Sequence, residues 1–285
     1  MALDAPDAPR GGGVRDAAPA PSGPAPLGLE PVSLAQLQTT ADLQTRVDRK
    51  YVVPEHLADA LLTELAPALR VLEIDGARDF AYESVFFDSP DRASYLGAAR
   101  GRRRRFKVRT RSYLDSGQCL LEVKTTGGRG ETVKERLPYA LADRARLTEA
   151  AHAFLADRGL PDAVRARLAP ALTTRYRRAT LLADDGSRAT IDSGLECASV
   201  GRTIAGLPGL VIIETKSAGR ATAVDRWLWR HHARPTRISK FGTGLAALDP
   251  TLPAHRWHRT LTRHVRTRTQ APATREAVRP ATPRA

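Results

Sequence analysis

Seven stretches of the chain alternate ionic and non-ionic side chains with the two-residue period of a β-strand. Successive side chains of a strand point to opposite faces, so each stretch collects its charges on one side. In FKVRTR, Lys107, Arg109 and Arg111 share one face, and Phe106 and Val108 take the other. The full set is residues 46–53, 106–111, 120–125, 132–137, 175–181, 187–192 and 211–216. The pattern predicts strands with one ionic face and one apolar face.

Four other segments carry apolar residues at helical spacing, namely 54–69, 89–100, 143–159 and 220–233. Pro54 and Ser89 suit helix starts, and Gly159 suits a helix end. These helices need apolar partners, which the uncharged strand faces supply. An antiparallel β-barrel with a polar, cationic interior and a partial coat of helices satisfies both patterns, so we expect an α+β fold.

The two ends of the chain differ in composition from its centre. Residues 1–31 contain seven Pro, seven Ala and five Gly, with almost no large apolar side chains. Such a segment cannot bury enough surface to offset the entropy lost on ordering. We therefore expect a disordered extension over 1–32, a folded unit over 33–250, and a basic, disordered tail over 251–285.

The formal charge of +14 and the pI of about 10.6 point to an anionic partner. Half of this charge lies in the tail, which has eight Arg against one acid, Glu276. The tail, with Trp257 among its arginines, could contact polyanions or remain a solvated extension. The folded unit shows no helix-turn-helix, zinc-ligand or RNA-binding signature, so we expect no specific nucleic-acid partner.

The apolar stretches and the two cysteines of the chain indicate its cellular compartment and the redox state of its thiols. It has no stretch of roughly 20 apolar residues and no signal-peptide core. Cys119 and Cys197 have no CxxC spacing and are expected to be buried free thiols, although a disulfide between them stays open. We expect a cytoplasmic protein without a transmembrane segment.

The ionic strand faces carry many more cations than acids. Arg109 and Arg111 lie two residues apart, so both guanidinium forks aim at one region, and a fork matches phosphate oxygens bidentately. The other inward cations are Lys50, Lys107, Lys124, Lys134, Arg136, Arg178, Arg188, Lys216 and Lys240, the last in a loop before a short helix. The inward acids are Asp48, Glu122, Asp192 and Glu214. Because unpaired buried cations are costly, the excess favours an anionic ligand such as a phosphate chain over a solvent-exposed face.

The carboxylates admit two roles. Glu122 and Glu214 each stand two residues before a lysine, in LEVK and in ETK. Each could pair with a neighbouring cation, or it could hold a hard divalent metal together with substrate phosphates. The sequence pattern leaves both roles open.

Taken in order, the segments DRKY, VFFDSPD, KVRTRSY, LEVK, VKER, RYRRA, RATID, VIIETK and SKFGTG resemble the polyphosphate polymerase domain of the vacuolar transporter chaperone (VTC) family. This family is a branch of the triphosphate tunnel metalloenzymes, the CYTH-like superfamily, and the resemblance runs from about residue 44 to 248. It implies an eight-stranded antiparallel tunnel barrel that binds phosphate chains and a divalent metal, typically manganese, with magnesium as the alternative.

The resemblance also implies roles for individual residues. The family's tunnel-lining basic positions fall on Lys50, Arg109, Arg111, Lys124, Lys134, Arg178, Arg188 and Lys240. We expect Lys107, Lys134, Arg136 and Lys216 to add phosphate contacts. Glu214 matches the metal-binding acid, with Glu122 and Asp48 as further candidates. The first strand departs from the wider superfamily, because it carries Arg46 and Asp48 where two glutamates are usual.

The leading hypothesis is a metal-dependent phosphotransferase that moves the terminal phosphoryl group of ATP onto a polyphosphate chain. The alternatives are hydrolysis of inorganic or nucleoside triphosphate in the same tunnel, and a non-catalytic module that binds polyphosphate or nucleotides. No Ser-His or Cys-His pairing indicates a covalent nucleophile. GGRG at 127–130 lacks the P-loop pattern and is typical of a hairpin turn.

Overall fold

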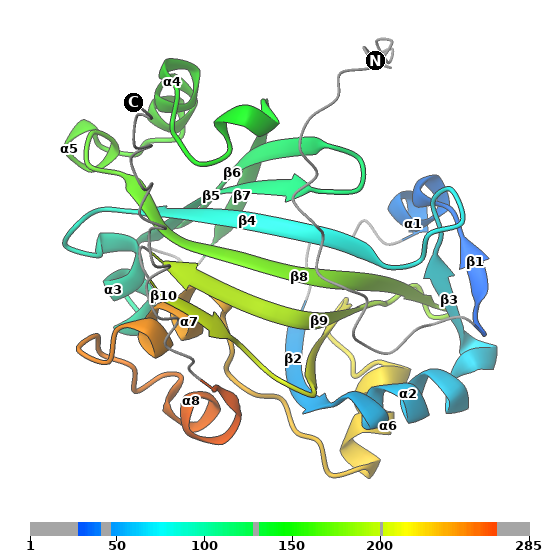
Figure 1. Cartoon of the computed structure of the whole chain (residues 1–285). Helices are drawn as coiled ribbons and strands as arrows, with labels where there is room; N and C mark the ends of the chain where they lie inside the picture. Colours follow the sequence, from blue (N-terminus) through cyan, green and yellow to red (C-terminus); the bar gives the residue numbers. More distant parts are fainter. Residues whose placement is uncertain (1–27, 41–46, 128–130, 200–201, 267–285) are drawn as a thin grey trace, which may run out of the picture.

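The computed structural model describes residues 28–40, 47–127, 131–199 and 202–266 (Figure 1). Eight antiparallel strands form one continuous path in the order β2-β11-β9-β8-β4-β5-β6-β7. In that order the strands span Val47–Pro54, Leu210–Ser217, Arg188–Ser199, Ala169–Ala183, Phe80–Asp88, Arg105–Tyr113, Gln118–Thr126 and Thr132–Tyr139. The predicted α+β fold with eight antiparallel strands is confirmed. In the described residues no strand pair joins β7 to β2, so hydrogen bonding does not close the barrel.

Three shorter strands extend the sheet. β10 (Arg202–Ala205) pairs with β9, and β3 (Leu69–Leu72) pairs with β8. β1 (Glu30–Val32) lies parallel to β3, beside α1 (Leu34–Thr40). Residues 30–32, expected to belong to a disordered extension, are therefore part of the sheet.

Helices cover the outer faces of the strands, as the apolar alternation predicts. α2 (Glu55–Glu64) and α6 (Ala223–Arg230) lie side by side in Figure 1 and share one hydrophobic cluster with β2, β8, β9 and β11. α4 (Glu149–Asp157) packs on β4, β5 and β6 through Phe154 and Leu155. α5 (Asp162–Arg165) follows α4, and the 3₁₀ turns η1 (Ala66–Ala68) and η2 (Leu141–Asp143) connect elements.

A third hydrophobic cluster joins α3 (Ala93–Ala99), α7 (Lys240–Leu248) and α8 (His258–His264) to the sheet. Ser89 does not cap α3 directly, because the helix begins at Ala93, although the Ser89 hydroxyl accepts a hydrogen bond from the Ala93 N–H at 3.1 Å. Lys240 is the first residue of α7 rather than a loop residue. Ser239 caps this helix by accepting from the Gly242 N–H at 3.2 Å.

The expected boundary at residue 250 is too early. Residues 251–266 pack against the fold, and the Trp257 side chain is only 5% exposed, in contact with the ring of Tyr95. A Cβ atom on Gly242 would lie 2.3 Å from the Trp257 ring, so α7 and Trp257 fit closely together. Residues 1–27 and 267–285, and with them most of the two predicted disordered segments, lie outside the described residues.

The structure also bears on the two cysteines, the turn at 127–130 and the question of a membrane-spanning helix. Cys119 and Cys197 are both buried free thiols. Gly127 lies between β6 and β7, as expected for a hairpin turn, while residues 128–130 of that turn lie outside the described part. None of the helices in the described ranges has the length and apolar character needed to cross a membrane.

We predict that Trp257→Ala lowers the free energy of unfolding by about 3–5 kcal/mol, because it removes a buried aromatic side chain and leaves a cavity between α3 and α7. Urea denaturation followed by circular dichroism measures this change. His255→Ala is the matched control, since His255 lies exposed in the same segment and should change stability by less than about 0.5 kcal/mol. Equal stabilities for the two variants would show that this segment does not belong to the fold.

Candidate functional site

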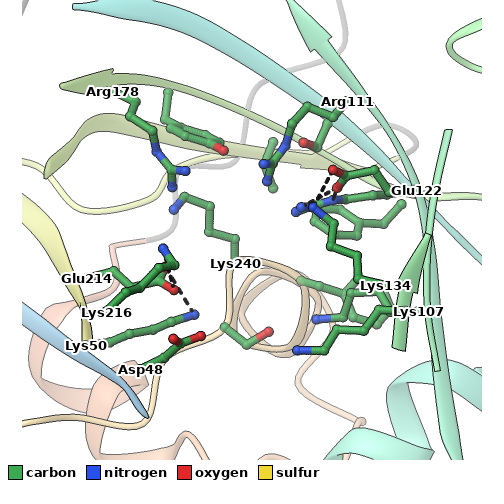
Figure 2. Close-up of a pocket in the computed structure, with 18 residues that line it drawn as sticks. Asp48, Lys50, Lys107, Arg111, Glu122, Lys134, Arg178, Glu214, Lys216 and Lys240 are labelled. Carbon is green, nitrogen blue, oxygen red and sulfur yellow. Dashed lines mark hydrogen bonds and ion pairs between the residues drawn. The ribbon is translucent and has the colours of Figure 1, made fainter. Parts of the chain in front are cut away.

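The eight strands curl around a cavity of about 240 Å³ (Figure 2). Side chains from seven of the strands and from the start of α7 line it. The basic ones are Lys50, Lys107, Arg109, Arg111, Lys124, Lys134, Arg178, Lys216 and Lys240. The acidic ones are Asp48, Glu122 and Glu214. Alternation along separate strands thus brings the predicted charges together in one space, with cations in excess.

Strand register explains how the charges on β5, β6 and β7 meet. Arg109 on β5 lies opposite Glu122 on β6, which in turn lies opposite Arg136 on β7. The adjacent inward row is Lys107, Lys124 and Lys134, which contains no acid. Three lysines therefore lie side by side across three strands.

Glu122 compensates part of this charge. Its Oε2 accepts from Arg109 Nε at 2.7 Å and lies 2.5 Å from Arg109 Nη2. Its Oε1 lies 2.6 Å from Lys134 Nζ and 3.3 Å from Arg136 Nε. The carboxylate is buried and occupied by cations on both oxygens, so its contacts favour the ion-pairing role over the metal-binding role.

A looser group of charges lies on the opposite side of the cavity, on β2 and β11 (Figure 2). Glu214 lies opposite Lys50, and Lys216 lies opposite Asp48. The Glu214 carboxylate is 3.1 Å from Lys216 Nζ and 3.8 Å from Lys50 Nζ. These longer contacts leave the Glu214 oxygens more accessible than those of Glu122.

The sequence predicted that Asp192 is an inward-facing acid but gave it no role in binding phosphate or metal. It is buried beneath the cavity and accepts from Arg178 Nε at 2.5 Å and from Arg178 Nη2 at 2.8 Å. The Lys240 ammonium group pairs with the same carboxylate. Asp192 therefore holds two lining cations in place. Its position on the inward face of β9, two and four residues from Thr190 and Arg188, was the available signal.

A second cavity of about 580 Å³ adjoins the first. Arg111, Lys134, Arg178 and Lys216 line both, and the second adds Arg136 and Arg188. On the other side, Asp48, Lys50 and Ser239 are shared with a third cavity of about 500 Å³. All fourteen predicted site residues thus line the central cavity or the second cavity of about 580 Å³, and the basic side chains that these two cavities share connect them.

The crowding of like charges perturbs ionisation. Burial, together with neighbouring cations led by Arg109, lowers the pKa of Lys107 to about 7. Burial also lowers the pKa of Lys134 to about 8, although Glu122 acts in the opposite direction. Burial opposes the ionisation of Glu122 and Glu214, but the surrounding cations outweigh it and hold the pKa of each carboxyl below its ordinary range.

Aromatic rings form part of the wall, and the sequence reasoning did not anticipate them. Lys240 Nζ lies 4.2 Å from the ring centroid of Tyr176, and the Arg178 guanidinium lies 5.4 Å from the rings of Tyr82 and Tyr176. Further contacts of this kind pair Arg111 with Tyr82, Arg109 with Phe86, and Lys107 with Phe86 and Phe241. A ring face attracts a cation, so these rings add to the stabilisation that Asp192 and Glu122 give to Arg178, Lys240 and Arg109.

The candidate metal ligands do not form one cluster. Glu122 projects from β6, on the side of the cavity opposite Glu214 and Asp48 (Figure 2). Among the described residues, no group of three or more His, Cys, Asp and Glu side chains is arranged to hold a metal ion. Two carboxylates on neighbouring strands do fit a hard cation that takes its remaining ligands from water and substrate phosphates. Arg46, the first residue of the strand predicted over 46–53, lies outside the described ranges.

Solved structures provide distant likenesses. A putative adenylyl cyclase from Hippeastrum, described as revealing a dominant triphosphatase activity, is 15% identical, with a TM-score of 0.46 and coverage of 70% of this chain and 94% of that chain. A putative adenylate cyclase from Vibrio parahaemolyticus is 16% identical, with a TM-score of 0.41 and coverage of 69% and 95%. A protein from Pyrococcus horikoshii is 12% identical, with a TM-score of 0.42 and coverage of 72% and 99%.

No curated protein matches the chain. The family model described as the VTC domain, in contrast, matches residues 45–249. The matched residues include every strand of the eight-stranded path and all the side chains of the central cavity. The chain therefore belongs to the VTC domain family.

Proposed function

We propose that this protein is a polyphosphate polymerase-like phosphotransferase that moves the terminal phosphoryl group of ATP onto a phosphate chain inside the basic cavity. The observation that carries the proposal is the continuous cationic lining. It surrounds the central cavity and extends past Arg111 and Arg178 to Arg136 and Arg188. A lining of this extent suits a chain of phosphates that continues beyond a single triphosphate.

In the proposed reaction, a terminal oxygen of the chain attacks the γ-phosphorus of ATP while the bond from that phosphorus to the β–γ bridging oxygen breaks. The products are ADP and a chain longer by one phosphate, with no net gain or loss of atoms or electrons. Arg109, Arg111 and Lys124 would bind the nucleotide's phosphates, and Arg178 and Lys240 would neutralise charge at the transferred group. Catalysis would come from positioning and charge stabilisation, as is usual for phosphoryl transfer.

Residues of the adjoining cavity would hold the acceptor chain. Arg188 and Arg136 line that cavity, while Lys134 and Lys216 line both. The Asp192 carboxylate keeps Arg178 and Lys240 in place, so the cations at the proposed point of transfer are pre-organised. Binding at several positions along one path would allow the chain to advance as it grows.

Triphosphate tunnel proteins are generally dependent on a divalent metal, and Mn²⁺ or Mg²⁺ suits the oxygen donors on β2 and β11. Glu214 would hold the metal, with Asp48 on the neighbouring strand. Glu122 would remain paired with Arg109 and Lys134. When bound, such a metal neutralises charge on phosphoryl oxygens.

The direct test is incubation of the purified protein with ATP and Mn²⁺, followed by separation of free phosphate from chain-linked phosphate. We expect ADP and chain-linked phosphate to form together. Arg111→Gln should lower kcat/KM by about 100-fold or more, because it removes a donor aimed at developing charge. Arg226→Gln removes one positive charge from the exposed face of α6 and should leave the rate unchanged.

The other results of this test identify the alternatives. Release of free phosphate alone would indicate a tunnel-type triphosphatase. Tight binding of triphosphate without turnover would indicate a binding module. Either result would refute the polymerase assignment, while leaving the basic cavity as the site of triphosphate binding.

Affinity for inorganic triphosphate should fall as pH rises. The anion binds best to protonated Lys107, whose pKa in the free protein is about 7, so binding weakens once the solution pH exceeds that value. The expected loss is up to about tenfold per pH unit between pH 7 and 8.5. Isothermal titration calorimetry measures it. Lys107→Arg keeps its charge over this range and should remove the Lys107 part of the dependence, leaving the part that belongs to Lys134, whose pKa is about 8. An unchanged slope in Lys107→Arg would assign the whole effect to another group.

Glu214→Gln should raise the Mn²⁺ concentration needed for half-maximal turnover by about tenfold or more, since even the partners of a metal's ligands are worth that much. Glu135→Gln is the matched control, because Glu135 pairs with Arg158 outside the cavity. Equal Mn²⁺ requirements in wild type and Glu214→Gln would exclude Glu214 as the metal ligand.

A further inference from the structure

One row of polar atoms crosses three neighbouring strands on the inner face of the sheet. Arg111 on β5 lies opposite Ser84 on β4, and Ser84 lies opposite Thr174 on β8. All three side chains line the central cavity. Neighbouring strands are about 4.8 Å apart, so the row spans about 10 Å of the wall.

Each residue of this row has a buried polar atom that lacks a hydrogen-bond partner among the described residues. These atoms are the hydroxyl oxygens of Ser84 and Thr174 and the Nε of Arg111. Ser84 is 1% exposed and Thr174 is 0% exposed. Buried polar groups in native proteins are normally hydrogen-bonded, so a row of groups without protein partners requires an explanation.

Two buried hydroxyls on the outer face of the sheet have protein partners, whereas the buried Thr190 hydroxyl, on the inner face of β9, also lacks one among the described residues. The Thr110 hydroxyl, on the outer face of β5, donates to the Arg144 carbonyl at 2.6 Å. The Thr215 hydroxyl, on the outer face of β11, donates to Asp225 at 2.7 Å. The unpartnered hydroxyls therefore belong to the tunnel face, where a bound ligand can supply the missing acceptor.

The wall around this row is uncharged apart from Arg111. β4 contributes Tyr82, Ser84 and Phe86, and β8 contributes Thr174 and Tyr176 ahead of Arg178. The cations of the other strands attract any anion that enters, whatever its orientation. A hydroxyl contributes only when an acceptor lies within hydrogen-bond distance, so this wall is suited to fix the orientation of the anion.

We propose that Ser84 and Thr174, together with Arg111 Nε, form a neutral hydrogen-bonding subsite for the non-bridging oxygens of a phosphate chain. This proposal deepens the proposed function and rests on it. The two hydroxyls donate to phosphoryl oxygens, which are strong acceptors, and thereby hold the chain against the β4–β8 wall. The ligand class is a linear phosphate chain, whether inorganic or part of a nucleotide.

The test measures the Kd for inorganic triphosphate by calorimetry and the Tm of the unliganded protein, for Ser84→Ala and Thr174→Val. We expect each variant to bind about tenfold more weakly, the usual effect of losing a hydrogen bond to a charged group. The Tm should stay within about 2 °C of wild type, because no hydrogen bond within the protein is lost. Thr174→Ser retains the hydroxyl and should bind within about twofold of wild type.

The salt dependence of the affinity distinguishes the contribution of the neutral subsite from that of the charged lining. Screening acts on charge–charge attraction, so the affinity ratio of wild type to Lys124→Gln should shrink as NaCl rises. The ratio of wild type to Thr174→Val should stay constant over the same range, because a hydroxyl carries no charge. A ratio for Thr174→Val that shrinks with salt would contradict the subsite.

Thr110→Val is the matched control for loss of a buried hydroxyl that has a protein partner. It should lower the Tm by several degrees and leave the Kd unchanged. A comparable fall in Tm for Thr174→Val would show a structural role and overturn the subsite. Wild-type affinity in both Ser84→Ala and Thr174→Val would overturn the subsite alone, whereas a wild-type protein that does not bind triphosphate would overturn the proposed function as well.

Discussion

Nine basic side chains around a cavity of about 240 Å³ impose the main constraint on this structure. Like charges repel strongly where water is scarce, and burial of each cation adds a desolvation cost. Three carboxylates relieve part of the repulsion, because Glu122, Asp192 and Glu214 each contact at least two cations. Aromatic faces relieve more of it. The remaining positive charge is directed into the cavity, where an anion is the natural counterpart.

The same alternation that fills the interior with charge builds the exterior of the domain. On β5, β6 and β11, apolar buried residues alternate with the inward charges, as with Val108, Leu121, Val123, Val211 and Ile213. Helices α2, α4 and α6 cover these outward faces. A register slip of one residue would place cations against the helices and apolar side chains in the tunnel, so the two faces specify the pairing together.

Attraction and orientation are divided between different walls of the cavity. The lysines and arginines of β5, β6, β7 and β11 concentrate positive charge, which attracts anions whatever their length. The β4–β8 wall offers rings and hydroxyls, whose contacts depend on distance and direction. Asp192 connects the two kinds of wall, because it anchors Arg178 of β8 and Lys240 at the start of α7. This division suits an enzyme that must bind a uniform polymer tightly and still position one phosphorus atom for transfer.

Most of the fold and the charged part of the site could be predicted from the sequence. A strand period of two is a local property, so it identified seven of the eight tunnel strands and assigned Lys107, Arg109 and Arg111 to one face. The charge pattern did not predict β4, because its inward residues, Tyr82, Ser84 and Phe86, are uncharged. For the same reason it did not predict the row that contains Ser84 and Thr174, although VFFDSPD was recognised as part of the family resemblance.

Residue identity and local strand geometry are enough to set the separation of charged and apolar faces and the excess of cations. The tertiary structure alone decided which acid meets which cation, that Glu122 is occupied by Arg109 and Lys134, and that Trp257 belongs to the core. It also decided that Arg111, Ser84 and Thr174 form one row. Each of these depends on register and packing between segments far apart in the chain, which no local pattern encodes.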